Sequence, residues 1–486
     1  MPAIITNKFR IHNSEQFSES FSEASPNVYY MGLGRPQAFA TSTRGDSRTE
    51  NEGTDSAPLT PIDDIQTEFF TFDDLLAAKI VSSSDRTYVV PRRDWTTATT
   101  YDIYRHDYGN RVTGGTTTQA ANSGATNLYD ATFYVMNSSY QIYKCLDNNS
   151  DAASTVEPSG TSTSILSTAD GYKWKYMYSL TASQRSNFLS TDFMPVATDS
   201  TVSAAATDGA VNICRIKTAG SGGTDGSHTG VAIRGDGSSG EATVTVSGGV
   251  VTAVAVTTPG TGYTYGYIRN ADIVTAGATS LSGSEVDVII EPKGGHGYNA
   301  VEELGGFFVM LNVNFEGTES ANTGDVTVAN DFRRVCLIRD PLSSGSAASA
   351  TTLRGTKAVL LTGSPGTFTA DEEINQATTG AVGKVVEYDA TNKLLYFIQT
   401  RFNDEGVDSN GNATAFSGTN VITGQDSSAT GTPSSSSSTV NNVVIASGYS
   451  VPEIDADSGD VIYIENRTAI TRASDQTENV KLIVEF

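Results

Sequence analysis

Hydrophobic and polar residues alternate in short stretches along much of the chain, which is the pattern of half-buried β-strands. In the final segment, alternate residues from Val480 to Phe486 are apolar, and Lys481 and Glu485 fall on the opposite face. The earlier segment 461–464 is apolar on both faces, which predicts a strand covered on both sides. The chain is therefore expected to end in a hydrophobic core.

The strongest alternation lies in segment 171–180. One face carries only aromatic residues, namely Tyr172, Trp174, Tyr176 and Tyr178. Such a face is typical of a protein core or a subunit interface, and less often of a surface that stacks sugars.

Turn and capping residues predict the connections between strands. Gly248-Gly249 predicts a two-residue hairpin turn, and a second hairpin is expected over 383–398. The segment 71–74 resembles a capping box and predicts a helix whose apolar stripe continues into 75–80. A second capping pattern at 181–184 predicts another short helix.

These elements predict a mainly β fold with short helices, built as an antiparallel β-sandwich core with inserted small β-modules. An extended N-terminal arm is expected over residues 1–60, with one short ordered element at Val28–Gly34. The expected segments are 1–207 for the arm and first part of the core, 208–290 for one inserted module, 291–344 for the resumed core, 345–440 for a second module with flexible flanks, and 441–486 for the closing strands.

Composition and charge narrow the possible functions. The 486 residues include 46 Gly, 21 Tyr and 19 Phe, which favours strands and turns. Acidic residues number 55 against 31 basic ones, giving a net charge of -24, so we expect neither nucleic acid nor an anionic membrane as a partner. The odd, widely spaced cysteines and the lack of an apolar leader predict a soluble chain in a reducing compartment.

No group of residues in the sequence has the spacing of a known catalytic or metal-binding motif. The four histidines have no zinc-ligand spacing, and neither a nucleophile elbow nor a phosphate-binding loop is present. His296, flanked by glycines, could be exposed to a substrate, but a turn in which it bonds a neighbouring carbonyl is preferred. Acidic pairs such as Glu302-Glu303 are weak evidence for a catalytic site, because acidic residues are frequent throughout the chain. We therefore expect no enzyme activity, metal or cofactor.

Several blocks resemble the dimeric baseplate wedge protein of T-even-like contractile-tailed phages. The blocks are Tyr29–Arg35, Arg92–Trp95 with Tyr101-Asp102, Gly171–Tyr178, Gly294–Tyr298 with Glu303–Gly306, and Tyr463–Arg467 with Arg472, Asp475, Gln476 and Glu478. They are spread over most of the chain. The two expected modules depart from the pattern of the family.

The resemblance implies a structural virion protein of the tail baseplate, assembled in the host cytoplasm. It would form a homodimer, join other wedge proteins and take part in baseplate rearrangement during infection, with tail-fibre proteins as further partners. The alternative is an adhesin or fibre-attachment module that binds a host glycan or a fibre through the inserted modules. A polysaccharide depolymerase is a third reading.

In a structural protein, the chemistry lies in core and interface contacts, where aromatic residues and arginine act as anchors. The candidates for organising the core or an interface are Trp95, Trp174, Tyr176, Arg467 and Arg472. The charged residues after segment 461–464 are expected to form a paired polar turn between two buried strands.

Overall fold

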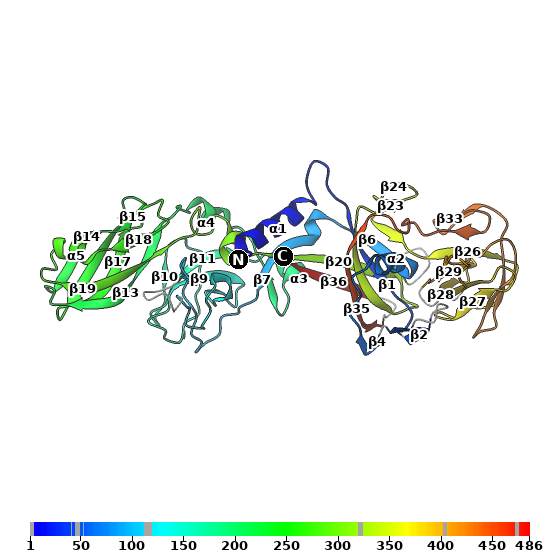
Figure 1. The fold of residues 1–486 in the computed structure, drawn as a ribbon, viewed down its shortest axis with the longest axis horizontal. Coiled ribbons are helices and arrows are strands. Elements are labelled where there is room, and N and C mark those ends of the chain that lie inside the picture. The colour runs from blue at the N-terminus through cyan, green and yellow to red at the C-terminus, as the bar shows by residue number, and fades with distance from the viewer. Residues whose placement is uncertain are drawn as a thin grey trace. The chain divides into compact units, whose positions relative to one another are not determined.

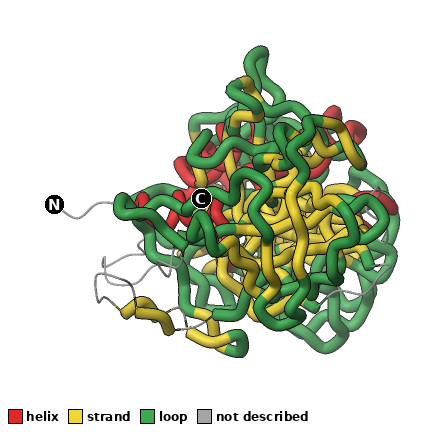
Figure 2. Tube along the Cα trace, turned by 90° about the vertical axis from the view of Figure 1, so that its right-hand side faces the viewer, coloured by secondary structure: helices red, strands yellow, loops and turns green. Residues whose placement is uncertain are grey.

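The computed structural model describes residues 4–39, 41–43, 49–51, 53–110, 119–318, 324–401, 406–471 and 476–486. The fold is mainly β, with 42% of residues in strands and 11% in helices, as predicted. Antiparallel sheets dominate, and Figure 2 shows few helices among the strands and loops. None of the described helices is long and apolar enough to cross a membrane.

The chain divides into two compact units. Unit 1 comprises Met1–Gln16, Thr87–Met310 and Ile483–Phe486, and unit 2 comprises Phe17–Arg86 and Leu311–Leu482. Elements that continue from one unit into the other are helix α1 (Asn7–Glu19) and strands β7 (Arg86–Pro91), β20 (Phe308–Thr318) and β36 (Thr477–Glu485).

The first part of unit 1 is a sheet around the aromatic segment (Figure 1). Its strand order is β10 (Leu166–Ser167), β11 (Lys173–Ser179), β9 (Gln141–Asp147) and β8 (Tyr134–Met136). Short helices and a further strand follow, namely α3 (Ala182–Phe188), β12 (Phe193–Pro195), α4 (Ser200–Ala204) and α6 (Ala300–Leu304). Helix α3 begins with the predicted capping box, in which Thr181 and Gln184 each bond the other's backbone.

The second part of unit 1 is a two-sheet module that corresponds to the expected segment 208–290. One sheet contains β13 (Val211–Ser221), β19 (Ser282–Ile290), β18 (Gly266–Ile268) and β15 (Arg234–Gly235). The other sheet contains β14 (Gly226–Ala232), β16 (Glu241–Ser247) and β17 (Val250–Thr258). The module also contains helix α5 (Asn270–Thr275). Both sheets bury side chains in one shared core. The predicted Gly248-Gly249 hairpin is present, because Ser247 pairs with Val250.

The core sheet of unit 2 has the order β25 (Thr352–Arg354), β6 (Leu75–Val81), β1 (Tyr29–Gly34), β22 (Phe332–Arg339) and β35 (Asp460–Ile470). The central strand β1 is buried along its whole length. Helix α2 (Ile65–Asp73) precedes β6, and Asp64 caps it by accepting a hydrogen bond from Thr67 N.

Unit 2 contains the second β-module of the chain, which follows the core strand β25. Its strand order is β29 (Leu394–Ile398), β28 (Ala381–Asp389), β27 (Glu373–Gln376), β30 (Ile422–Gly424), β31 (Thr430–Pro433), β26 (Lys357–Thr362) and β34 (Tyr449–Ser450). An additional β29–β26 pairing closes six of these strands into a ring around a separate core. The remaining short strands are β2 (Thr41–Thr43), β3 (Thr49–Asn51), β4 (Gly53–Thr54), β5 (Ala57–Pro58), β21 (Val326–Thr327), β23 (Leu342–Ser343), β24 (Ser346–Ala347), β32 (Ser438–Val440) and β33 (Val443–Ile445).

Three local predictions were wrong. The N-terminal arm contains helix α1, which buries Ile11 and Ser14. The helix predicted to begin at 71 instead ends at Asp73, and the apolar run that follows it is strand β6, held between two neighbouring strands. The segment 461–464 is not covered on both faces, because Ile462 is 44% exposed.

Candidate functional site

The strongest concentration of buried chemistry lies in unit 1, around the glycine-flanked His296. The loop that carries this histidine leaves β19 at Glu291 and ends where Asn299 caps α6 by accepting a hydrogen bond from Glu302 N. The backbone of Gly295 has φ +92, and a Cβ there would lie 2.4 Å from Thr207 N. The loop can therefore follow this path only with glycine at position 295.

His296 is buried and makes two hydrogen bonds. Its Nε2 lies 2.8 Å from the carbonyl oxygen of Tyr176, and its Nδ1 lies 3.1 Å from Oε1 of Glu303. Each ring nitrogen therefore faces an oxygen that can accept a hydrogen bond. His296 does bond a carbonyl, as preferred from the sequence, but that carbonyl belongs to a distant strand.

Lys144 lies between two carboxylates. Its Nζ donates to Oε2 of Glu291 and, at 2.6 Å, to Oε1 of Glu303, while it faces the Tyr104 ring at 4.2 Å. The second oxygen of Glu303 accepts a 2.6 Å hydrogen bond from Gly297 N. Glu303 therefore faces Lys144, His296 and the backbone of Gly297.

Lys175 and Asn212 complete the group at Glu291. Lys175 Nζ is 3.7 Å from Oε1 of Glu291, and Asn212 Nδ2 donates to the same oxygen at 2.6 Å. We call Lys144, Lys175, Glu291, His296 and Glu303 the unit 1 ionic network. Two lysines and a histidine therefore share two carboxylates.

The pKa shifts follow from burial opposed by opposite charge. Burial alone would lower the pKa of Lys144, but the attraction of Glu291 and Glu303 outweighs it and raises that pKa. Burial alone would raise the pKa of both glutamates, yet Lys144 holds both below the usual range. Burial lowers the pKa of Lys175, which its distant contact with Glu291 does not offset.

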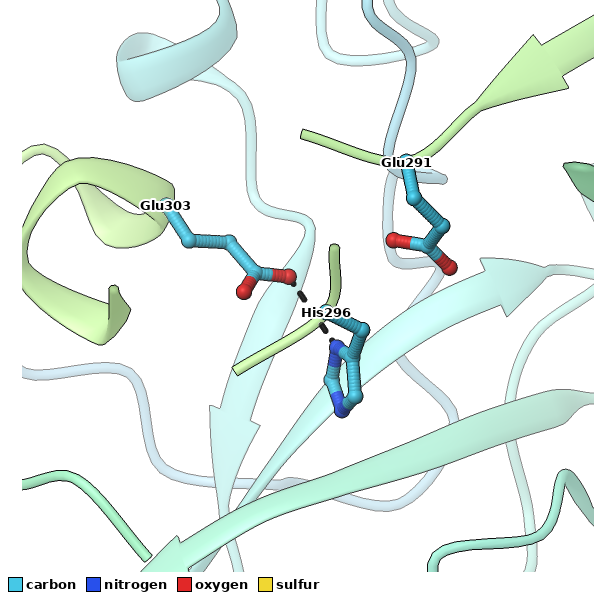
Figure 3. Close-up of side chains that lie close together, drawn as sticks. All are labelled: Glu291, His296 and Glu303. Carbon is cyan, nitrogen blue, oxygen red and sulfur yellow. Dashed lines mark hydrogen bonds and ion pairs between the residues drawn. The ribbon is translucent and has the colours of Figure 1, made fainter. Parts of the chain in front are cut away.

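Figure 3 shows Glu291, His296 and Glu303 converging, with candidate ligand atoms within 4.8 Å of one another. Two carboxylates and an imidazole are a known metal-ligand combination. These residues do not fit a metal as they stand, because the Lys144 ammonium bonds both carboxylates and both ring nitrogens of His296 already face acceptor oxygens. The arrangement is that of a buried ion-pair network, in which every charge has a partner.

Unit 2 has a smaller buried group of the same kind. Nη1 of Arg334 donates to both oxygens of Asp74, at 3.0 and 3.1 Å, and Arg35 Nη1 lies 3.8 Å from the same carboxylate. Nε of Arg334 also donates to Asn466 Oδ1 at 3.1 Å, which ties β22 to β35. We call Arg35, Asp74 and Arg334 the unit 2 ionic cluster.

Two of the candidates from the sequence lie in the core of unit 1. Trp174 is fully buried and stacks on Tyr172 with ring centroids 5.3 Å apart. Tyr176 is buried on the same strand and supplies the carbonyl that His296 bonds. Trp95 is half-buried beside this core, and its Nε1 donates to Ser154 Oγ.

The arginine candidates lie elsewhere. Arg467 is half-buried within strand β35 and is not part of a turn, and its Nε has no hydrogen-bond partner among the described residues. Arg472 lies outside the described residues, as does Asp475. The structure therefore brings Trp174 and Tyr176 together but does not join them to Arg467.

Sequence reasoning missed Lys144 and Glu291, and it set Glu303 aside as one of an uninformative acidic pair. A signal was available for Lys144, because it is the one charge inside the otherwise apolar run 142–146, where an unpaired ammonium would be costly. Its carboxylate partners lie 147 and 159 positions away, and periodicity cannot identify partners at such separations.

No protein-family model matches the chain, and no curated protein is significantly similar to it in sequence.

Replacing Gly295 with alanine is expected to destabilise unit 1 strongly, since the new Cβ would meet the Thr207 backbone. Gly248→Ala is the matched control, because Gly248 also has positive φ but open space around its Cβ position. We expect the fall in Tm, measured by scanning calorimetry, to be at least twice as large for Gly295→Ala. Equal falls would mean that the loop tolerates a side chain at 295.

The unit 1 ionic network should also make stability depend on pH. The folded pKa of Glu303 lies below its unfolded value of about 4.3, so its contribution is present above that pH and is lost as pH falls through the folded pKa. Glu303→Gln should therefore show a flatter decline of Tm between pH 5 and pH 3 than the natural chain. The exposed Glu285→Gln variant should keep the natural slope, and an unchanged slope in Glu303→Gln would contradict the assignment.

Proposed function

We propose that the protein is a structural component of a contractile phage tail baseplate, where it acts as a homodimeric scaffold that joins neighbouring wedge proteins. Support comes from the location of the blocks that carry the resemblance. Lys175 comes from one block, His296 and Glu303 come from another, and all three meet in the unit 1 ionic network. Arg35, from a third block, contacts Asp74 in unit 2.

A scaffold function also suits the character of these networks. Their charged groups bond one another and are shielded from solvent, which fixes loops and strands in place and presents no reactive atom to a substrate. The two modules carry cores of their own, separate from the networks. Such an architecture provides rigid centres with added surfaces for neighbours.

The test is the location of the chain in assembled particles. We expect mass spectrometry to find it in purified tails, at a copy number equal to that of the other wedge proteins. Light scattering of the isolated protein at micromolar concentration should give twice the mass of one chain. Absence from purified tails, with the chain present only in the lysate, would contradict the proposal.

A second candidate is the adhesin, and one observation favours it. Tyr265 and Tyr267 are 57% and 46% exposed and lie two positions apart at strand β18 of the first module, so they fall on one face. Exposed aromatic rings can stack on sugars. If the adhesin reading holds, the double variant Tyr265→Ala, Tyr267→Ala will abolish attachment to host cells without affecting tail assembly. The control Tyr298→Ala removes an exposed ring outside the module and will leave attachment unchanged.

A further inference from the structure

A groove in unit 2 lies between the approach to helix α2 and the start of strand β35. Its volume is about 280 Å³, and its walls are Pro61, Ile62, Asp63, Asp64 and Glu68 on one side and Val461–Ile464 on the other. At one end, Asn466 Nδ2 donates to the carbonyl of Leu59 at 3.2 Å and closes the gap. The groove is therefore about as long as a strand of four residues.

One wall of this groove is the free edge of a sheet. Strand β35 is last in its sheet, and in the part of the chain that the structure describes it pairs only with β22. Apart from its pairing with β22, no backbone hydrogen bond joins Val461–Ile464 to another described segment. The outward N–H and C=O groups of an edge strand are a template for an added strand.

The groove also exposes apolar side chains on both walls. Ile62 is 65% exposed and faces the same cavity as Ile462. Large apolar side chains gathered around one groove mark an interaction site more often than single exposed ones do.

The charge of the groove indicates the kind of partner. Asp63 and Glu68 line it, and neither forms an ion pair with a described residue; Asp64 is engaged as the cap of α2. An incoming second copy would bring a net charge of -24 towards these carboxylates. A basic segment is attracted by the same field.

We propose that this groove binds an extended segment of a partner protein by strand addition to β35. The segment would place an apolar side chain against Ile62 and Ile462 and Lys or Arg side chains towards Asp63 and Glu68. Backbone hydrogen bonds to the edge supply affinity, and the side chains supply specificity. The inference rests on the proposed scaffold function, because a scaffold is held to its neighbours through such surfaces.

The test uses the full chain and a fluorescein-labelled seven-residue peptide of alternating lysine and valine. Fluorescence anisotropy near physiological salt should detect binding, and the corresponding glutamate-valine peptide should not bind. Ile462→Asn and Glu68→Lys should each weaken binding about tenfold, the effect of losing roughly 1.4 kcal/mol.

Matched controls separate this groove from general attraction to an acidic surface. Val444→Asn removes an apolar side chain that is 70% exposed on β33, and Glu241→Lys reverses an exposed charge on β16. Both should keep the natural affinity within twofold. Equal losses in the control and groove variants would overturn the proposal, as would an unchanged affinity in the groove variants.

Light scattering of the same variants tests whether a second copy of the chain occupies the groove instead. If Ile462→Asn converts a dimer of the natural chain into a monomer, a second copy fills the groove and the proposal of a basic partner segment is overturned. Groove-dependent peptide binding by a chain that is absent from tails would count against the scaffold function alone. Tail localisation without groove-dependent binding would count against this inference alone.

Discussion

Replacing Lys144 with methionine is expected to lower the Tm of unit 1 by about 6 to 20 °C. Methionine has a similar volume, so the variant removes the charge while filling most of the space. Glu291 and Glu303 would then be buried carboxylates without their main cation. Breaking a buried ion pair in this way costs about 3–5 kcal/mol, and each kcal/mol corresponds to about 2–4 °C in a unit of this size.

Lys217→Met is the matched control, because Lys217 forms an exposed pair with Glu285. It should leave Tm nearly unchanged. The combined variant Lys144→Met, Glu291→Gln and Glu303→Gln should lose less stability than the sum of the single changes, since it leaves no buried carboxylate without Lys144. A Lys144→Met variant as stable as the control would mean that the network contributes nothing to the fold.

Arg334→Met is expected to destabilise unit 2 by a similar amount, about 3–5 kcal/mol. Asp74 would keep only Arg35, at 3.8 Å, and Asn466 would lose its bond from strand β22. Chemical denaturation followed by tryptophan fluorescence would not isolate this unit, because both tryptophans lie in unit 1. Hydrogen exchange of the β1 and β22 amides is the suitable measurement.

Arg467→Ala is the control for this prediction. Arg467 lies on the next strand but is half-buried, and its Nε has no partner among the described residues. We expect its removal to change amide protection in β22 much less than Arg334→Met does. A larger effect at Arg467 would return that residue to the fold-organising role first expected from the sequence.

The sequence predicted best where one local pattern decided the structure. The aromatic alternation from Tyr172 to Tyr178 gave a buried strand, and Gly248-Gly249 gave a hairpin, because side-chain period and turn geometry are local properties. The buried face of the last strand, with Val480 and Leu482, followed from the same period.

The errors came from properties that are not local. The run 75–81 is apolar at nearly every position, so helical and strand spacing fit it equally, and only pairing with neighbours made it a strand. The segment 461–464 is apolar on both faces but lies at the edge of its sheet, and sequence does not give strand order. Helix α1 has no charged residues suited to its ends, so packing defines it.

The candidate site was predicted only in part for the same reason. His296 attracted attention through its glycines, but its hydrogen-bond partners, Glu303 and the carbonyl of Tyr176, could not be identified from the sequence. The sequence indicates that Lys144 needs an acidic partner, but the residues near it in the sequence do not identify Glu291 as that partner. Burial determines the chemistry of each group here, and burial results from the fold.

The most direct test of the scaffold account is a cryo-electron microscopy density map of assembled tails that contain this chain. The account predicts two copies side by side in each baseplate wedge, with a segment of another structural protein along the edge of strand β35. Density for the chain only at a fibre tip, or single copies whose modules alone touch the particle, would contradict it.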